Sequence, residues 1–332
     1  MADRSTIRDV ARVAGVSVST VSRVFTSPEL FREETRLKVY AAAEQLRYAP
    51  SKAATALTTG RTGNIGLVVP NLANPLFPEM VKAAQHQARR HNLAALLGDS
   101  DDDADDEEKL IHALSKDVDG LLLFSSLLRD EQIGSAGGLR PTVFVNRRVE
   151  GYPCVLVDAL QGMRLLTQYL SNLGHTGALY LAGPTNSWAA KDRQHALITA
   201  GEETGFQIEV TAPHRPTFES GTLAAEQLVR APLPSAVVCF NDVMALGLTA
   251  RLLEFGVQVP EQVSVVGWGG TQLASYTTPA VTTLAVPLSR LGSMAVDQLL
   301  LARNSETEGE PAPVSLEVTL SARATTSRAR TH

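Results

Sequence analysis

A short stretch near the start of the chain, residues 17–23, carries hydroxyl side chains and an arginine at helical spacing. It reads SVSTVSR. Such side chains suit nucleic acid, because hydroxyl groups bond to phosphates and bases, and guanidinium groups reach phosphates or guanine. Here Val18 can contact a thymine methyl, Ser19 can bond to more than one base, and Arg23 can reach guanine or a phosphate. Three further hydroxyls suit phosphate contacts that position a helix on DNA: those of Ser17, Thr20 and Ser22.

Two short helices must hold this stretch in place. Thr6 can cap the first helix, with Asp9 as the third residue of a capping-box variant, and Gly15 ends it. Ser17 can cap the second helix. A third helix is expected from about Glu33 to Arg47, and its apolar positions include Leu37, Tyr40, Ala41 and Leu46.

Two helices joined by a tight glycine turn and followed by a third predict a helix-turn-helix unit. The second helix of such a unit enters the major groove of DNA with its N-terminal residues toward the bases. The alternative is a small helical subdomain whose polar face is merely solvated.

The charge of the chain is distributed unevenly. Residues 1–62 hold ten Lys/Arg and six Asp/Glu, whereas the remainder holds 20 basic and 29 acidic residues, within a net charge of −5. A basic head suits a polyanion, and an acidic body does not. The sequence therefore indicates that any nucleic-acid contact belongs to the head.

The composition places the chain among soluble, cytoplasmic proteins. Its 44% hydrophobic and 20% charged residues are typical of globular domains, and no apolar run is long enough to span a membrane. The N-terminus lacks the pattern of a secretory leader. The two cysteines, Cys154 and Cys239, lie in separate apolar stretches and are expected to be buried free thiols.

From residue 65 onward, short apolar runs alternate with helical stretches. Before residue 160 the runs are IGLVV, AALLG, GLLLF, TVFVN and VLVD; after residue 175 they are ALYLAG, SAVVCF and VSVVGW. Fully apolar strands separated by helices predict doubly wound parallel sheets, covered on both faces. Two such sets predict an α/β body of two lobes, and the tail adds a helix near 291–302 and a strand near 316–323.

No pattern of enzyme or metal chemistry stands out. The seven histidines form no HExxH-type pair, and no phosphate-binding loop or nucleophile elbow is present. The acidic run DDDADDEE, residues 101–108, lacks the spacing of a calcium loop and is interpreted as a solvated helix start. We therefore expect no cofactor, no metal and no enzymatic activity, and a capping or structural role for His175.

Many segments resemble the LacI/GalR family of bacterial transcription repressors. The head stretch TIRDVARVAGVSVSTVSRVF resembles the family's DNA-binding head, and LGHTGALYLAGP, CFNDVMALGLTARLLEFGVQVPEQVSVVGWGG and YTTPAVTTLAVPLSRLG resemble body segments in the family's order. The resemblance spans about 320 residues. It implies a helix-turn-helix head followed by a two-lobed body like that of periplasmic binding proteins.

The resemblance also implies a domain organisation. Residues 1–50 would form the head, 51–62 the hinge helix and linker, and 63–332 the effector-binding and dimerisation domain. Within that domain we expect one lobe from about 63–160 and 290–315, and the other from about 161–289 and 316–330.

On this basis we expect a homodimer that binds a near-palindromic DNA operator. DNA contacts are expected from Thr6, Ser17, Val18, Ser19, Thr20, Ser22, Arg23, Lys52, Ala54 and Leu57. In the family the leucine at the position of Leu57 wedges into the minor groove and kinks the duplex. Without the resemblance, Leu57 would be interpreted as an ordinary linker leucine. Thr55 stands where the family often has Arg, which removes one phosphate contact, and Lys52 is available to compensate.

A small-molecule effector is expected between the lobes, beyond the carboxyl ends of the strands. Family positions point to Asn71, Leu76, Phe77, Asn146, Arg147, Arg193, Asn241 with its neighbour Asp242, and Trp268. Gly269 stands where a ligand-binding Asp is common, and Asn146 also replaces a frequent Asp. Pro216 stands where an aromatic platform is common, with Phe218 close enough to substitute. Fewer carboxylates suggest an acidic or phosphorylated effector, and a neutral sugar remains the alternative.

The prediction is a cytoplasmic repressor that a small effector releases from DNA, with corepression as the opposite sign of the same coupling. A solute-binding protein of a transport system shares the two-lobed body and is the alternative, although it needs no basic helical head. The sequence leaves open the effector, the operator and the regulated genes. The chain carries no apolar heptad at its end, which favours a dimer over a tetramer.

Overall fold

The computed structural model describes residues 5–26, 28–48, 60–304 and 312–330. The chain divides into two compact units, Met1–Gly63 and Asn64–His332, which we call the head and the body. Each is described separately.

The head is a cluster of short helices: α1 (Ile7–Ala14), α2 (Val18–Thr26), a 3-10 turn (Pro28–Leu30) and α3 (Glu33–Gln45). Gly15 ends α1 in the left-handed conformation, with φ +66°, and its N–H donates to the Ala11 carbonyl. Val10, Val21 and Val24 are fully buried between the helices. The three predicted helices and the glycine turn are confirmed.

The buried face of α3 differs from the predicted one. Val39, Ala42 and Ala43 fill the core, whereas Leu37 is 61% exposed and Tyr40 lies at the edge of the Phe25 ring. Ala41 is exposed, and of the predicted positions only Leu46 packs against the core. Val39, Ala42, Ala43 and Leu46 follow the spacing of one helix face, and Leu37 and Ala41 lie off that face.

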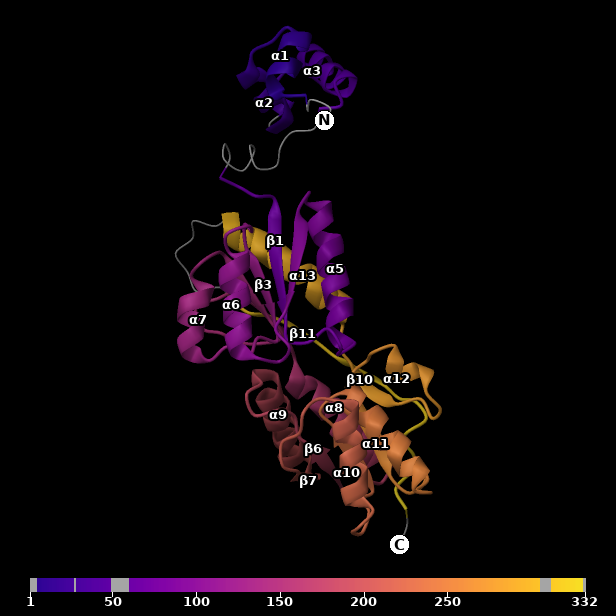
Figure 1. Cartoon of the computed structure of the whole chain (residues 1–332). Coiled ribbons are helices and arrows are strands. Elements are labelled where there is room, and N and C mark those ends of the chain that lie inside the picture. The colour runs from indigo at the N-terminus through magenta and orange to yellow at the C-terminus, as the bar shows by residue number, and fades with distance from the viewer. Residues whose placement is uncertain (1–4, 27, 49–59, 305–311, 331–332) are drawn as a thin grey trace. The chain divides into compact units, whose positions relative to one another are not determined.

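The first lobe of the body, called the N-lobe, is built on a six-stranded sheet. In spatial order its strands are β11 (Val314–Leu316), β5 (Cys154–Val157), β4 (Thr142–Val145), β3 (Leu121–Phe124), β1 (Asn64–Val69) and β2 (Ala94–Asp99). All neighbouring pairs are parallel. The central strands are buried along their length because helices cover both faces, as Figure 1 shows.

The second lobe, called the C-lobe, has a sheet of matching design. Its order is β12 (Thr319–Ser321), β10 (Thr282–Ala285), β9 (Ser264–Gly269), β8 (Ala236–Cys239), β6 (Gly177–Leu181) and β7 (Gln207–Val210). Only β12 is antiparallel to its neighbour. The predicted parallel sheets are therefore confirmed. The strands β7 and β10 were not among the predicted strands. The single strand predicted near 316–323 is wrong, because the chain forms β11 and β12 in different sheets.

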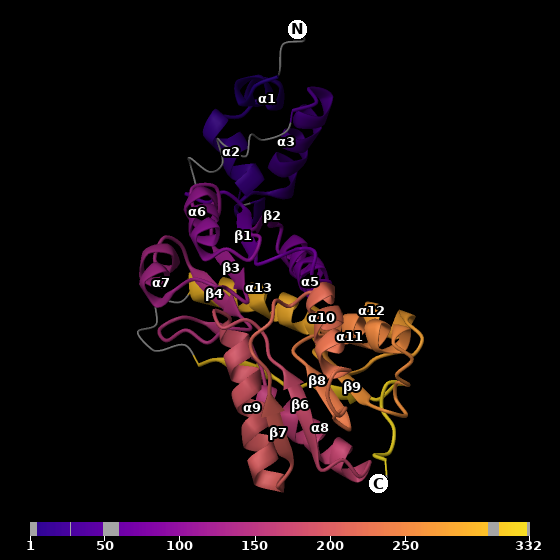
Figure 2. The same ribbon diagram turned by 60° about the horizontal axis from the view of Figure 1, so that its bottom comes forward.

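Helices flank both sheets. The N-lobe carries α5 (Leu76–Arg90), α6 (Ala104–Leu114), α7 (Asp130–Gly137) and α13 (Leu288–Asn304), and α13 packs along α5. The C-lobe carries α8 (Ala159–Asn172), α9 (Trp188–Thr204), α10 (Phe218–Leu228), α11 (Asp242–Glu254) and α12 (Leu273–Tyr276). Here α8 packs on α9, and α10 packs on α11, as Figure 2 shows.

The chain crosses between the lobes three times: from β5 to α8, from β10 to α13, and from β11 to β12. Each lobe is therefore assembled from separated segments. The carboxyl ends of the parallel strands and the loops that follow them form the cavity described below.

Candidate functional site

The exposed face of α2 carries the polar side chains predicted to meet DNA. The Ser17 Oγ accepts the backbone N–H of Thr20 at 3.1 Å and therefore caps the helix. It also lies 2.8 Å from the hydroxyl groups of Ser19 and Thr20. Val18 is 41% exposed, and Arg23 is exposed further along the helix. The hydroxyl groups surround the N-terminus of α2, whose free N–H groups favour an anion such as phosphate, and Arg23 lies in its last turn.

Apolar residues on the other side of α2 fix its orientation. Val21 and Val24 are fully buried, so the helix can present only one face outward. Ser22 lies between the two faces and is half-buried. The predicted DNA-binding side chains of α2 thus share one accessible region, and their contacts with DNA stay a prediction.

The start of α1 is held by an acidic cap. The Asp9 carboxylate accepts hydrogen bonds from the Thr6 backbone N–H, at 3.0 Å, and from the Thr6 hydroxyl, at 2.7 Å. With Arg12 beside it, these bonds lower the pKa of Asp9 to about 2. Thr6 is exposed next to the α1 N-terminus. The predicted hinge contacts Lys52, Ala54 and Leu57 lie outside the described residues.

A cavity of about 280 Å³ lies between the two lobes of the body. Its N-lobe wall comes from residues that follow β1 to β4, among them Pro70, Asp101, Asp102, Ser125 and Asn146. Its C-lobe wall comes from residues after β6, β7 and β8 and from α9. This is the edge of an open parallel sheet at which ligands bind. The cavity mixes carboxylates, amides and guanidinium groups with two phenylalanine rings.

Five of the predicted effector contacts line this cavity: Leu76, Phe77, Asn146, Arg193 and Asn241. Asn146 has φ +58°, and its amide donates to the Ser125 hydroxyl at 2.8 Å. The Asn241 Oδ1 caps α11 at the Met244 N–H, 2.8 Å away, and its amide donates to the Pro216 carbonyl. Both asparagines are held by the protein on one side and face the cavity on the other.

Arg193 is the most unusual group of the cavity. Its side chain is 5% exposed and lies between two rings, with Cζ 4.6 Å from the Phe240 centroid and 4.8 Å from the Trp268 centroid. One nitrogen donates to the Phe240 carbonyl at 3.0 Å. Burial lowers the pKa of Arg193 to about 10, so the group stays charged at neutral pH. The two ring contacts and this hydrogen bond hold the guanidinium group in one position at the cavity wall.

Four predicted contacts do not line the cavity. Asn71 supports its wall, since its amide donates to Asp102 Oδ2 at 2.9 Å. Arg147 is buried and donates to the carbonyls of Ser126 and Leu128. Trp268 lies behind Arg193, as the ring contact above shows. Asp242 accepts hydrogen bonds from Thr271 and Thr283 below the floor.

The structure also brings residues to the cavity that the sequence analysis missed. Asp101, Asp102 and Asp103 line it, and so does Arg215 from the other lobe. Burial raises the pKa of Asp102, against the opposing effect of Asn71 and Arg215. The acidic run was interpreted only as a helix start. Its place directly after a parallel strand, β2, is the signal that could have assigned it to the cavity.

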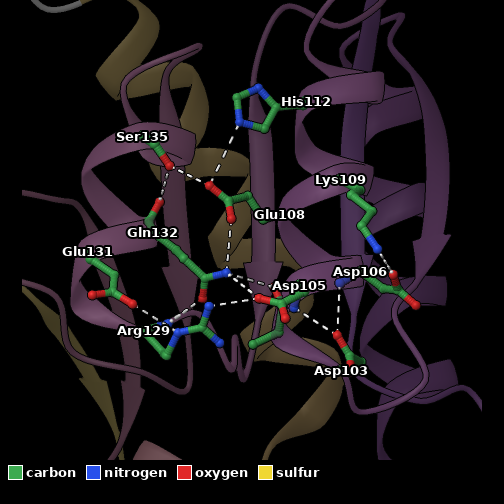
Figure 3. A network of polar contacts seen from close by, with 11 residues as sticks. Asp103, Asp105, Asp106, Glu108, Lys109, His112, Arg129, Glu131, Gln132 and Ser135 are labelled. Atoms are coloured by element: carbon green, nitrogen blue, oxygen red, sulfur yellow. Dashed lines mark hydrogen bonds and ion pairs between the residues drawn. The ribbon is translucent and has the colours of Figure 1, made fainter.

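The helix-start interpretation of the acidic run is nevertheless confirmed. Asp103 Oδ1 accepts the N–H groups of Asp105 and Asp106, as in an N-cap. Figure 3 shows the network beyond this cap, in which Gln132 and Arg129 of the α7 start bind Asp105 of α6. The acidic run therefore fastens α6 to α7 on one side and contributes to the cavity on the other.

The departures from the family pattern have local structural reasons. Gly269 has φ +136°, where an aspartate would be strained, and Gly270 has φ +73° with its Cα packed closely against Ala285. Pro216 does line the cavity, but Phe218 does not, so the proposed substitution of one aromatic platform by another is wrong. His175 bonds to Ser235 and the Ser327 carbonyl and has the structural role predicted for it. Both cysteines are free and buried.

Comparison with known proteins identifies the family. The model of bacterial regulatory proteins of the lacI family matches residues 6–51, and that of the periplasmic binding protein-like domain matches residues 167–326. The ribose operon repressor of Escherichia coli K12 is 34% identical over 306 residues, covering 89% of this chain and 92% of that protein. The chain belongs to the LacI family. The transcriptional repressor PurR of Vibrio cholerae is 33% identical over 314 residues, covering 92% of this chain and 93% of the relative.

A solved structure agrees with this assignment. The lac repressor dimer bound to operator and an anti-inducer matches with a TM-score of 0.86 at 27% identity, covering 98% of this chain and all of that chain. This LacI-family chain is a DNA-binding transcriptional repressor with an effector-binding domain. The head distinguishes it from a solute-binding protein, the alternative that the body alone left open. Among the described residues, no helix has the length and apolarity needed to cross a membrane.

Proposed function

We propose that the chain represses transcription as a homodimer on a near-palindromic operator, with one α2 helix in the major groove of each half-site. The exposed, polar N-terminus of α2 on its buried valine anchor is the observation that carries this proposal. The lac repressor dimer, solved on its operator, matches the chain end to end and supports it. The protein would act in the cytoplasm, where operator DNA lies.

Large apolar side chains on the C-lobe support dimerisation. Leu223 of α10, Phe255 at the end of α11, and Leu273 and Tyr276 of α12 are between 44% and 72% exposed. The helices α10, α11 and α12 pack in succession, and Figure 2 shows them on one side of the lobe. Apolar side chains gathered on one side of a soluble protein favour an interface. A second copy of the chain would cover them.

We further infer that the effector is a small, hydroxyl-rich molecule of about the size of a monosaccharide. A cavity of about 280 Å³ lies at the lower end of the usual range for ligand sites. Asparagine, serine, carboxylate and guanidinium groups from both lobes offer donors and acceptors for several hydroxyls. The hypothesis of an acidic or phosphorylated effector loses its basis, because it assumed a cavity poor in carboxylates, and three aspartates line this one.

The experiment is a gel shift on operators found by mapping the protein's genomic binding sites, with and without neutral monosaccharides. We expect selective binding of a near-palindromic duplex and a change in affinity with one neutral sugar or polyol. Matched sugar acids serve as controls. Failure to bind any duplex selectively would refute the regulator proposal, and a response to sugar acids alone would refute the neutral effector.

A further inference from the structure

A second cavity, of about 360 Å³, lies where the chain crosses between the lobes. Val157 and Ser315 contribute to it from β5 and β11 of the N-lobe. Trp188, Asp192, His195 and Thr199 contribute from α9 of the C-lobe. It shares no lining residue with the effector cavity. Its walls therefore belong to both lobes at a place that the effector site does not reach.

The helix α9 separates the two cavities. Positions 188, 192, 195 and 199 are spaced by three or four residues and share one face of the helix. Ala189 and Arg193, on an adjacent face, line the effector cavity. A molecule in either cavity would thus contact the same helix, α9.

The second cavity holds a carboxylate that no ion pair occupies among the described residues, although Arg193 and His195 lie near enough to act on its charge. Asp192 is half-buried, and within the described part of the chain it forms no hydrogen bond or ion pair. Burial raises the pKa of Asp192, against the opposing effect of the positive charges of Arg193 and His195. The neighbouring charge of Asp158 acts in the same direction as burial. One carboxylate oxygen of Asp158 is already used, because Oδ1 accepts the Gln161 N–H at 2.9 Å and caps α8. Arg148 is exposed at the lining and lies within ion-pair distance of neither aspartate.

An aromatic ring stands one turn away from this carboxylate. Trp188 is half-buried and packs against the apolar cluster of the N-lobe, so it bridges the lobes. An indole ring offers a flat apolar surface, and its face attracts cations. A carboxylate and an indole together are the groups that bind an amine carried on a flat apolar body.

We propose that this second cavity binds a small organic cation, whose ammonium group pairs with Asp192 and whose apolar body lies against Trp188. Because both lobes line the cavity, its occupant favours one lobe arrangement over another. Binding there is then linked to binding in the effector cavity, and the linkage is reciprocal. The coupling rests on the proposed effector site, whereas the binding itself does not.

The test is isothermal titration calorimetry of the full chain with three matched probes: benzylamine, benzyl alcohol and benzoate. Benzylamine is expected to bind, and the neutral and anionic probes to bind at least about tenfold more weakly, as for the loss of one charge-assisted hydrogen bond. Asp192→Asn should reduce the benzylamine affinity by a similar factor. Glu202→Gln makes the same change of charge on an exposed position of α9 and should leave it unchanged.

A further variant locates the probe. Asp101→Asn removes a carboxylate from the effector cavity at an exposed position and should leave benzylamine binding intact. The proposal is overturned if no probe binds, if benzyl alcohol binds as well as benzylamine, or if Asp192→Asn binds benzylamine like the unmodified chain. Loss of benzylamine binding in Asp101→Asn, with binding kept in Asp192→Asn, would place the probe in the effector cavity and would overturn the proposal too. Matching thermal unfolding curves show that each variant is folded. None of these outcomes depends on DNA binding.

Discussion

The body contains two arginines that are almost equally buried, and we expect the same substitution to destabilise the protein at only one of them. Arg147 is 7% exposed and Arg193 is 5% exposed. Replacement of each by methionine keeps most of the apolar volume and removes the charge. The comparison therefore distinguishes a structural role, expected for Arg147, from a ligand-binding role, expected for Arg193.

For Arg147→Met we expect a loss of about 3–5 kcal/mol in the free energy of unfolding. Its guanidinium donates to the carbonyls of Ser126 and Leu128, at 2.8 and 2.6 Å. It also opposes the charge of Glu107, which is 2% exposed and accepts the Leu127 N–H. Methionine would leave two carbonyls and a carboxylate buried without this partner.

For Arg193→Met we expect a change of about 1 kcal/mol or less. The lowering of its pKa to about 10 means that burial of the charge costs about 3 kcal/mol. Methionine recovers that cost and gives up one hydrogen bond and two ring contacts, which together contribute about the same amount. Effector affinity should nevertheless fall by about tenfold or more, because the ligand loses a charged donor.

The assay is urea unfolding of both variants, followed by circular dichroism, together with calorimetry of the effector once it is identified. Arg147→Met should unfold at a clearly lower urea concentration, and Arg193→Met near the concentration for the unmodified chain. If the two variants lose equal stability, Arg193 is a structural residue and the reasoning about the cavity is wrong. If Arg193→Met keeps full effector affinity, the guanidinium edge does not face the ligand.

Three further predictions concern the head and the body. Ser17→Ala should destabilise α2 by about 1 kcal/mol and weaken operator binding. Ser17→Asp should keep the cap but weaken operator binding more, because its carboxylate repels the phosphates. Thermal unfolding measures the loss of stability, and gel shifts measure the loss of binding. Arg23→Gln should lower the slope of log affinity against log salt by about 0.9 if Arg23 contacts a phosphate, and an unchanged slope would exclude that contact. Burial lowers the pKa of His175, so the unfolded chain binds its proton more readily than the folded one. The body should therefore lose stability as the pH falls below about 6.5. His175→Gln should flatten this pH dependence, which unfolding midpoints measured between pH 5 and 8 would show.

Local chemistry accounts for what the sequence could predict. Thr6, Gly15 and Ser17 act through neighbours no more than four residues away, and the helix limits followed from them. Apolar runs gave most of the strands, because a strand covered on both faces has no polar position. Asn146 and Asn241 were assigned to the cavity from the family resemblance, and their places just after β4 and β8 agree with that assignment.

The features that the sequence could not predict depend on contacts between segments far apart in the chain. Arg147 and Arg193 have the same chemistry, and only the carbonyls of the loop after β3 assign Arg147 to the interior. The aspartates at 101–103 reach the cavity because β2 lies beside β1. The local sequence does not predict this strand order. On α3 the packing against the other head helices buries the face that carries Val39 and Ala42 and leaves Leu37 exposed.

The threefold crossing of the chain between the lobes limits how such a protein can be recombined. The head is one continuous segment that ends near Gly63. A single gene junction can therefore transplant it onto another body. The N-lobe, by contrast, takes strands from both sides of the C-lobe segment, and β11 follows more than 150 residues after β5. No single junction can exchange either lobe, so new operator specificity is easier to acquire by gene fusion than half of a new effector cavity.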